Sequence, residues 1–341
     1  MANVVIGGVE GGATHTTVVL LDSEGNVLST VKGPGTNHFL LGMKECRRRI
    51  AELIDNAKKE AQLPEDVPLT AIGLSLSGCE QEETNQELVR GFLETYPSLS
   101  ERYAIGSDTE GSVACISNKG GITCIAGTGS NTILINPDGT KAQCGGWGHL
   151  LADAGSAYGI ALESIKLYFD DNDDFRKAPH STEVLWNTIK DHFEVKSHMD
   201  LLPHFYTSFK KEHIAGLCKK LSVCANDGGD ELSKLIFKNA GKDLARCISA
   251  VIAKASKELY ENESGLQVLC VGSVWLSWDL LKDGFLQWIE EHTTIKQLSL
   301  VRLTTTMAIG AAYMAADQLH IQLHRDYKQN YQEFYRYIRK F

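Results

Sequence analysis

The chain has 341 residues, which is more than one hydrophobic core usually supports, so two domains are expected. Its net charge of -9, with Lys and Arg mostly scattered singly, argues against a nucleic-acid or anionic-membrane partner. The nine cysteines show no CxxC or His/Cys ligand spacing, which favours reduced thiols in a cytoplasmic protein over a disulfide framework or a zinc site. Because the chain opens directly in a predicted strand and contains no long uncharged apolar window, neither secretion nor membrane spanning is expected.

An apolar strand, a Gly/Thr turn and a second apolar strand occur twice in the chain, and each copy closes at an acidic-Gly turn. The first copy occupies residues 4–25 with its glycine turn at 7–14. The second occupies residues 122–139 with its turn at 126–130, and its second strand lies at the same distance from the closing turn. Glycine turns let backbone N–H groups approach an anion closely. Two such turns facing each other predict a clamp for the phosphates of a nucleotide.

The first half continues with alternating strands and helices. A strand is predicted at 27–31, an amphipathic helix at 46–61, a buried strand at 69–76, a helix around 88–93 and a short strand at 103–106. Hairpins are antiparallel and helical crossovers join parallel strands, so this order predicts a mixed-sheet α/β domain.

The second half repeats this order with longer helices. Residues from about 170 to 227 are mainly helical and have no counterpart in the first half, which indicates an insertion. Strands are predicted at 266–271 and 298–303, and the small residues at 308–312 predict a helix that packs very close to a neighbour. Aromatic residues at helical spacing over 327–338 predict a C-terminal helix.

Asp108 is the strongest candidate for a catalytic residue. It follows the short strand at 103–106 and precedes a predicted helix start, so its carboxylate is expected at the carboxyl edge of the first sheet, where open α/β sheets bind ligands. A helix N-cap is an alternative of about equal weight. A carboxylate placed there can act as the general base that takes the proton of a sugar hydroxyl as the hydroxyl attacks a γ-phosphoryl group.

Several other residues favour a polyhydroxylated ligand. Asn37, Ser77 and Asp153, like Asp108, come just after predicted strands or glycine-containing turns. Each alone would more often be an ordinary turn residue, and their number is what favours a binding site.

Trp147 stands among three glycines, Gly145, Gly146 and Gly148, so its ring can lie over a sugar face or rest against a flexible turn. His149 has no second metal ligand nearby in the sequence, which favours a packing or hydrogen-bonding role.

These motifs resemble, in order, those of the eukaryotic N-acetyl-D-glucosamine kinases, within the acetate and sugar kinase, heat-shock protein and actin superfamily. The matching segments are residues 7–14, 36–38, 74–78, 107–108, 127–131, 144–149, 155–158 and 270–275. Each phosphate loop alone is a weak signal, whereas the ordered set covers essentially the whole chain.

The resemblance implies an α/β fold of two ribonuclease H-like domains, of the actin-like ATPase and sugar kinase type, with an active-site cleft between them. The N-terminal domain would comprise residues 1–118 plus a C-terminal helix at about 325–341. The second would comprise residues 119–324 with the helical insertion at about 170–227. A homodimer is also implied.

The resemblance further implies ATP-dependent phosphorylation of the 6-hydroxyl group of N-acetyl-D-glucosamine, with Asp108 as the base. The implied sugar-binding residues are Asn37, Ser77, Gly78, Asp108, Gly145, Gly146, Trp147 and Asp153. The implied nucleotide-binding residues are Gly11, Gly12, Thr14, Thr128, Gly129, Asn131, Gly216, Gly272 and Ser273. Mg²⁺ would arrive with ATP, and Glu10 would contact it through water.

Three alanines depart from the family pattern: Ala13, where a third glycine is common, and Ala152 and Ala154, on either side of Asp153. Because Ala152 and Ala154 stand beside a carboxylate that is implied to contact the sugar, N-acetylmannosamine and glucosamine stay open as alternative substrates. The chain lacks the cysteine-rich zinc motif of the bacterial ROK sugar kinases, which points to the eukaryotic branch.

Two readings from other functional classes stay open. One is an ATPase activator that shares the fold and binds an iron–sulfur cluster at a dimer interface, although Cys124 and Cys144 are not in the expected arrangement. The other is an inactive sugar-binding regulator, against which the presence of Asp108 argues.

Overall fold

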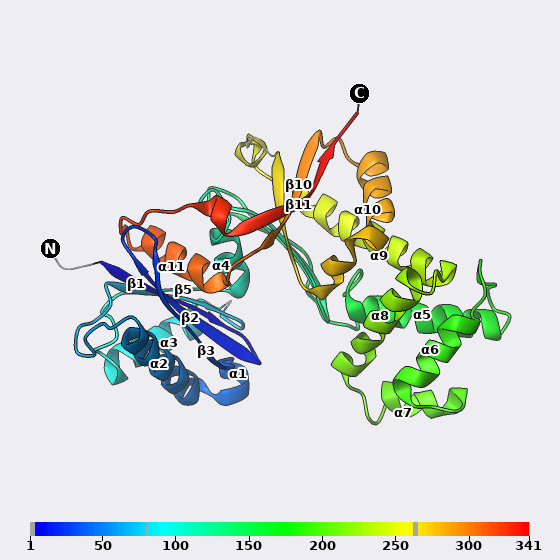
Figure 1. Ribbon diagram of the computed structural model, residues 1–341, viewed down its shortest axis with the longest axis horizontal. Helices are drawn as coiled ribbons and strands as arrows, with labels where there is room; N and C mark the ends of the chain where they lie inside the picture. Colours follow the sequence, from blue (N-terminus) through cyan, green and yellow to red (C-terminus); the bar gives the residue numbers. More distant parts are fainter. Residues whose placement is uncertain (1–3, 80, 262–264, 341) are drawn as a thin grey trace. The chain divides into compact units, whose positions relative to one another are not determined.

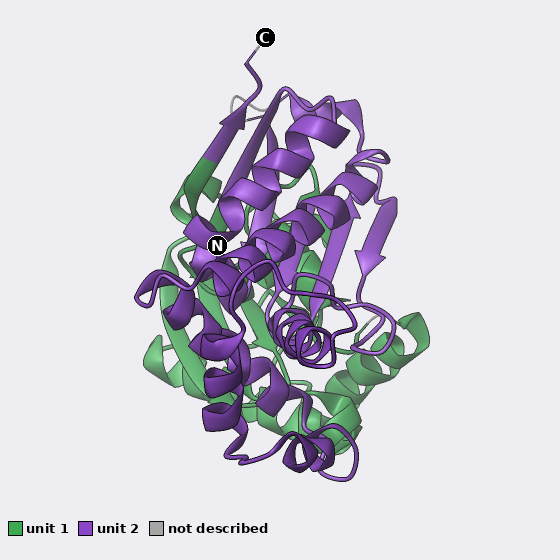
Figure 2. Cartoon of the chain, turned by 90° about the vertical axis from the view of Figure 1, so that its right-hand side faces the viewer, with its two compact units in different colours: residues 1–121, 301–335 green, residues 122–300, 336–341 purple. Residues whose placement is uncertain are grey.

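The computed structural model describes residues 4–79, 81–261 and 265–340. Contact clustering divides the chain into two compact units, which Figure 2 shows in two colours. Unit 1 comprises residues 1–121 and 301–335, and unit 2 comprises residues 122–300 and 336–341. The chain passes from unit 2 back to unit 1 earlier than the sequence suggests, because the segment 301–324 packs within unit 1.

Unit 1 is built on a sheet of strand order β3-β2-β1-β4-β5 (Figure 1). Its elements are β1 (Val5–Gly11), β2 (His15–Asp22), β3 (Val27–Pro34), α1 (His38–Leu41), α2 (Met43–Glu60), β4 (Ala71–Leu76), α3 (Glu82–Thr95), β5 (Tyr103–Gly106), α4 (Asp108–Ala114), α11 (Met307–Gln318) and the 3₁₀ turn η4 (Tyr327–Gln329). Strand β1 is antiparallel to β2 and parallel to β4, and β4 is parallel to β5. The predicted mixed sheet is therefore confirmed.

Both faces of the unit 1 sheet are covered. On one face, Val18 and Leu20 of β2 pack in a core with residues of α2 and α3. On the other face, Val19 and Leu21 pack in a core with residues of α11, which lies across the sheet in Figure 1. Alternating strand side chains point to opposite faces, so a strand covered on both sides reads as a continuous apolar run.

Helix α11 approaches the strands without side chains in between. A Cβ atom placed on Gly8 would lie 1.9 Å from the carbonyl oxygen of Ala308, and one on Gly73 would lie 1.9 Å from that of Ala311. The predicted close packing of the run 308–312 is confirmed, but its neighbour is the first sheet. The same packing corrects the first glycine turn, because Gly7 and Gly8 belong to β1 and only residues 12–14 form the turn.

Unit 2 repeats the same sheet plan with additions. The sheet order is β11-β10-β9-β6-β7-β8, in which β9-β6-β7-β8 corresponds to β4-β1-β2-β3. The strands of this sheet are β6 (Gly121–Ala126), β7 (Ser130–Ile135), β8 (Lys141–Gly145), β9 (Leu266–Val271), β10 (Gln297–Leu303) and β11 (Tyr331–Ile338). Strands β10 and β11 cross the boundary between the units, because residues 301–303 and 331–335 are counted in unit 1. The closing turns also match, because Gly25 and Gly139 have φ values of 80° and 82°. The internal repeat predicted from the sequence is confirmed at the level of strand order.

Helices form most of the rest of unit 2. They are α5 (Ala157–Asn172), α6 (Glu183–Phe193), η1 (His198–Leu201), α7 (Leu202–Phe205), α8 (Lys211–Asn226), α9 (Glu231–Ile252), η2 (Lys257–Tyr260), η3 (Ser273–Ser277) and α10 (Trp278–His292). Helix α9 packs against β7 and β8 on one side and against α10 on another. Gly241 allows the second contact, because a Cβ there would lie 2.0 Å from the carbonyl oxygen of Leu281. The expected helical insertion is present as α6 to α8.

The predicted C-terminal helix is wrong. Residues 331–338 form β11 at the edge of the second sheet. The aromatic spacing of Tyr331, Phe334, Tyr335 and Ile338 fits a helix, but aromatic residues also favour strands, and pairing with β10 decides between the two.

None of the helices found in the described ranges combines the length and the apolar character needed to cross a membrane.

Candidate active site

The first glycine turn lies where three segments of unit 1 meet. Gly12 N–H donates to the carbonyl of His15 at 3.0 Å and closes the turn between β1 and β2. At Gly11, a Cβ atom would lie 2.3 Å from Thr36 Oγ1 and 2.5 Å from Leu76 Cδ2, so only glycine fits. The Gly11 carbonyl in turn accepts from the backbone N–H of Ser77 at 2.9 Å. Gly11 therefore brings the residues after β3 and those after β4 to the same end of the sheet.

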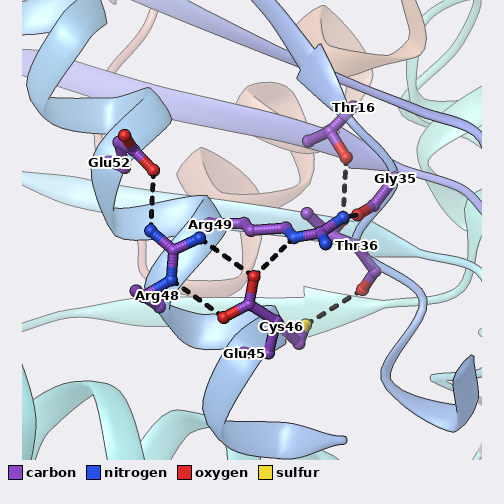
Figure 3. A network of polar contacts seen from close by, with 8 residues as sticks. All are labelled: Thr16, Gly35, Thr36, Glu45, Cys46, Arg48, Arg49 and Glu52. Atoms are coloured by element: carbon purple, nitrogen blue, oxygen red, sulfur yellow. Dashed lines mark hydrogen bonds and ion pairs between the residues drawn. The ribbon is translucent and has the colours of Figure 1, made fainter. Parts of the chain in front are cut away.

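A polar network fixes the segment just before Asn37 (Figure 3). Arg49 of α2 donates to the carbonyl of Gly35 at 2.9 Å, and Cys46 Sγ donates to the carbonyl of Thr36 at 3.0 Å. The hydroxyl groups of Thr16 and Thr36 are 2.9 Å apart. Asn37 follows as the N-cap of α1, with its Oδ1 accepting from the backbone N–H of Phe39 at 2.9 Å. Its backbone position is thus set by α2 and β2.

Asp108 is the first residue of α4. The N-cap is Ser107, which forms a capping box with Glu110, so the N-cap alternative for Asp108 is wrong. Ser77 Oγ donates to Asp108 Oδ2 at 2.8 Å, and no donor of the described residues reaches Asp108 Oδ1. The carboxylate is half-buried. Asp108 is thereby oriented through one oxygen, and the other is left to accept a proton.

Glu10, the predicted magnesium partner, contacts the start of α11. The hydroxyl of Thr306, the N-cap of that helix, donates to Glu10 Oε2. Because only this oxygen is engaged among the contacts described, the other fits a water-mediated contact with a cation. Ala13 in the same turn does not adopt a positive φ, so alanine is accommodated where glycine is common.

The second glycine turn is held against the start of α5. Gly127 N–H donates to the carbonyl of Gly129 at 2.9 Å. The carbonyls of Gly127 and Thr128 accept from the backbone N–H groups of Ala157 at 2.9 Å and Tyr158 at 3.3 Å. The backbone of this turn is therefore preorganised by the helix that follows.

A cavity of about 460 Å³ opens beside this turn within unit 2. Thr128, Gly216 and Ser273, all predicted from the sequence to bind nucleotide, line it together with Val274 and Leu276. The cavity thus offers hydroxyl groups and an apolar wall, as a nucleoside requires.

One residue that lines the cavity, Cys218, and one that precedes a lining residue, Gly272, are each constrained by their surroundings. Burial raises the pKa of the Cys218 thiol to about 12, so this lining residue stays neutral near pH 7. Gly272, next to Ser273, has φ 107°, and a Cβ there would lie 2.4 Å from the carbonyl oxygen of Ala126. Only glycine allows the turn after β9 to approach the end of β6 so closely.

Asp153 is buried beside the second turn. It is 3% exposed and has a positive φ of 70°. Its Oδ1 accepts from the backbone N–H of Ser130 at 2.9 Å, and its Oδ2 lies 2.7 Å from Lys211 Nζ. A Cβ on Gly129 would meet both side chains, at 2.8 Å and 3.0 Å. Both carboxylate oxygens are therefore engaged in shaping the turn, and the predicted sugar contact would share these partners.

The sequence reasoning missed Lys211. A signal was available, because Lys211 opens α8, and a cation at a helix N-terminus opposes the helix dipole unless an anion offsets it. The buried carboxylate of Asp153 is that anion.

The glycine loop around Trp147 follows β8. Gly145 and Gly146 have φ values of 88° and 79°, and Gly146 N–H donates to the carbonyl of Ser130 at 3.1 Å. Gly146 also packs against the side chain of Asn131, because a Cβ there would lie 2.8 Å from Asn131 Cγ. The Trp147 side chain is 67% exposed.

His149 stacks on Phe209 with ring centroids 4.8 Å apart and meets the ring of Tyr158 edge-on at 5.3 Å, in keeping with a packing role.

The predicted residues thus gather in two places. Unit 1 brings together Gly11, Gly12, Asn37, Ser77, Gly78 and Asp108, with Thr14 exposed at the same turn. Unit 2 brings together Thr128, Gly129, Asn131, Gly145, Gly146 and Asp153 at its turn, with Gly216 and Ser273 in the adjoining cavity. Over the described residues, no group of three or more His, Cys, Asp or Glu side chains is arranged to hold a metal ion, and all nine cysteines are free thiols.

Two copies of one mixed sheet, each with a glycine turn at the same place, make up a fold that is also seen in a solved sugar kinase. Within this class, the chain belongs to the BadF/BadG/BcrA/BcrD ATPase family, whose family model matches residues 8–315.

Relatives with curated functions cover most of the chain. The N-acetylmuramic acid/N-acetylglucosamine kinase of Clostridium acetobutylicum is 27% identical over 91% of this chain and 98% of its own length. The N-acetyl-D-glucosamine kinase of Dictyostelium discoideum is 28% identical over 74% of this chain and 81% of its own length.

Solved structures share the fold. A structure from Chromobacterium violaceum has a TM-score of 0.65 at 22% identity and covers 91% of this chain and 98% of its own. The ROK hexokinase of Thermus thermophilus has a TM-score of 0.56 at 13% identity and covers 92% and 99%.

Proposed function

We propose that the protein is an ATP-dependent amino sugar kinase that phosphorylates the 6-hydroxyl group of N-acetyl-D-glucosamine. The observation that carries the proposal is the Ser77–Asp108 hydrogen bond of 2.8 Å beside the first glycine turn, which orients a half-buried carboxylate and leaves one oxygen as a proton acceptor. The relatives in Clostridium and Dictyostelium, described as kinases of N-acetylated amino sugars, support the substrate class.

In the proposed reaction, Asp108 accepts the proton of the 6-hydroxyl group. The sugar oxygen forms a bond to the γ-phosphorus of ATP as the bond from that phosphorus to the bridging oxygen of ADP breaks. General-base assistance of this kind contributes roughly 10²–10⁴-fold. Asn37 and Ser77 lie at the same edge of the sheet and would orient the sugar, so positioning supplies the rest of the rate enhancement together with charge neutralisation.

The nucleotide is assigned to the second glycine turn and the cavity beside it. Thr128, Gly216 and Ser273 would contact the nucleoside, and the backbone of residues 127–129 would hold phosphate oxygens. Glu10 would hold Mg²⁺ through water, and the cation neutralises charge on the phosphates when bound.

The finer features of the proposal come from the resemblance. These are the preference for N-acetylglucosamine over N-acetylmannosamine or glucosamine, membership of the eukaryotic branch, a homodimeric state and a cytoplasmic location. Ala152 and Ala154 bear on the sugar preference because they flank Asp153. Their backbones close the turn around Asp153, with Ala152 N–H donating to the carbonyl of Gly148 at 2.8 Å and the Ala154 carbonyl accepting from Ser130 Oγ at 2.8 Å.

A second candidate function is ATP hydrolysis coupled to a protein partner. The description of the family as ATPases favours it.

The deciding experiment is coupled ADP release with ATP and Mg²⁺ across N-acetylglucosamine, N-acetylmannosamine, glucosamine and glucose, with a control lacking sugar. The proposal predicts turnover that depends on sugar and is strongest with N-acetylglucosamine. Strongest turnover with another amino sugar would correct the substrate and keep the reaction class. ADP release that is the same without sugar would favour the ATPase alternative, and none under any condition would overturn both.

A further inference from the structure

His38 is a buried histidine without a polar partner. It follows Asn37 in α1, is 6% exposed, and no hydrogen-bonding group of the described residues reaches its Nδ1 or its Nε2. Buried polar groups in native proteins nearly always have a partner, and an orphaned one is destabilising. The packing of α1 alone would be better served by an apolar side chain of similar size.

The surroundings of His38 place it among the candidate sugar residues of unit 1. A Cβ on Gly78 would lie 3.2 Å from His38 Cε1 and 2.8 Å from the ring of Phe39, so both rings rest on the turn that carries Ser77. Ser77 is the residue that holds Asp108. The network of Figure 3 fixes the backbone just before His38, so the chain that carries the imidazole is anchored on its N-terminal side.

Phe39 adds an apolar surface at the same point. Its ring centroid lies 4.2 Å from that of His38, and the residue is 69% exposed. An exposed aromatic ring beside an unpartnered imidazole offers apolar contact and hydrogen bonding together. A neutral imidazole has one donor and one acceptor, and a secondary amide presents one of each with an apolar group attached.

We propose that His38 and Phe39 recognise the N-acyl group of the acceptor sugar, with His38 hydrogen-bonding the amide and the ring of Phe39 contacting the acyl methyl group. This inference rests on the proposed kinase function and names residues that determine its specificity. It gives the unpartnered histidine a role at a position where packing alone would favour leucine.

The test compares His38→Leu, His38→Gln and wild type in steady-state kinetics with N-acetylglucosamine, glucosamine and ATP, alongside melting temperatures. His324→Leu changes an exposed histidine of the same unit and serves as the matched control. For His38→Leu we expect KM for N-acetylglucosamine to rise about tenfold, the factor for one lost hydrogen bond of about 1.4 kcal/mol. KM for glucosamine, KM for ATP and kcat should stay near wild type, and the melting temperature should not fall, because the unpaired nitrogens are removed. His38→Gln keeps a donor and an acceptor and should retain most of the affinity.

Three results would overturn the inference while leaving the kinase proposal intact. An unchanged KM for N-acetylglucosamine in His38→Leu would show that the histidine is only a packing residue. Equal increases for both sugars would show that the contact is not with the acyl group. A large loss of melting temperature in both the Leu and the Gln variants would show a structural role. Absence of sugar-dependent turnover in wild type would instead overturn the proposed function, and this inference with it.

Discussion

The two units carry carboxylates of opposite character beside equivalent glycine turns. In unit 1, Asp108 is half-buried and accepts a single hydrogen bond, from Ser77. In unit 2, Asp153 is buried, has left-handed backbone geometry and engages both oxygens, one with a backbone N–H group and the other with the cation of Lys211. One sheet plan, used twice, thus holds one carboxylate with an oxygen left to accept a proton and another whose two oxygens both have partners. The repeated sheet places each carboxylate beside a glycine turn, and the hydrogen-bond and ion-pair partners of each carboxylate determine whether an oxygen is left to accept a proton.

The largest effect is expected from Asp108→Asn. The amide keeps the shape and the contact with Ser77 but cannot take a proton, so kcat should fall by about 10²–10⁴-fold. Binding of N-acetylglucosamine, measured by titration calorimetry, should be largely retained. If binding and turnover were lost together, Asp108 would be a structural residue or a primary sugar ligand.

Lys211→Met addresses the other carboxylate. It leaves Asp153 buried without its cation, which should lower the free energy of unfolding by about 3 kcal/mol, the low end for a broken buried pair because Lys211 is partly exposed. KM for ATP should rise as the second turn loosens. Lys210→Met, one residue earlier and exposed, is the control and should be near wild type in urea unfolding and kinetics. A Lys211→Met protein as stable as wild type would mean that Asp153 does not depend on this pair.

Ser77→Ala tests the orientation of the base. Loss of a hydrogen bond to a charged acceptor should lower kcat by about tenfold without removing the base itself. Ser77→Thr retains the donor and should recover much of the rate. Turnover unaffected in the alanine variant would contradict the view that this bond positions Asp108.

The smallest effect concerns Glu163, a half-buried carboxylate of unit 2. Burial is the main cause that raises the pKa of Glu163 in unit 2, although Asn239 donates to it at 3.0 Å. Between the unfolded and the raised folded pKa, the folded state binds more protons, so stability falls as pH rises through this interval and stays reduced above it. Glu163→Gln should therefore raise the melting temperature relative to wild type at about pH 7.5 and lose this advantage near pH 4, around the ordinary pKa of glutamate. A constant difference at both pH values would argue against a buried charge.

Much of the fold could be predicted because apolar strand patterns and glycine turns recur in both halves of the sequence. The position of α11 could not, since which sheet receives its small-residue face is decided by contacts such as those of Gly8 and Gly73. The C-terminal strand was misread because its aromatic spacing fits two periodicities, and only pairing with β10 resolves it.

The candidate site was predicted unevenly for a related reason. Asp108 and Thr128 stand in motifs, so a role could be predicted for them, whereas Lys211 belongs to no motif and His38 lies in the matching segment 36–38 without a predicted role. Their interest arises from burial and partners, which a single sequence does not display.

The most direct test of the account is ³¹P NMR of the wild-type protein with ATP, Mg²⁺ and N-acetylglucosamine. The account predicts a growing resonance of a sugar 6-phosphate matched by ADP, with no accumulation of inorganic phosphate, and no such resonance with Asp108→Asn. Inorganic phosphate accumulating without a sugar ester would contradict it and identify the chain as an ATPase.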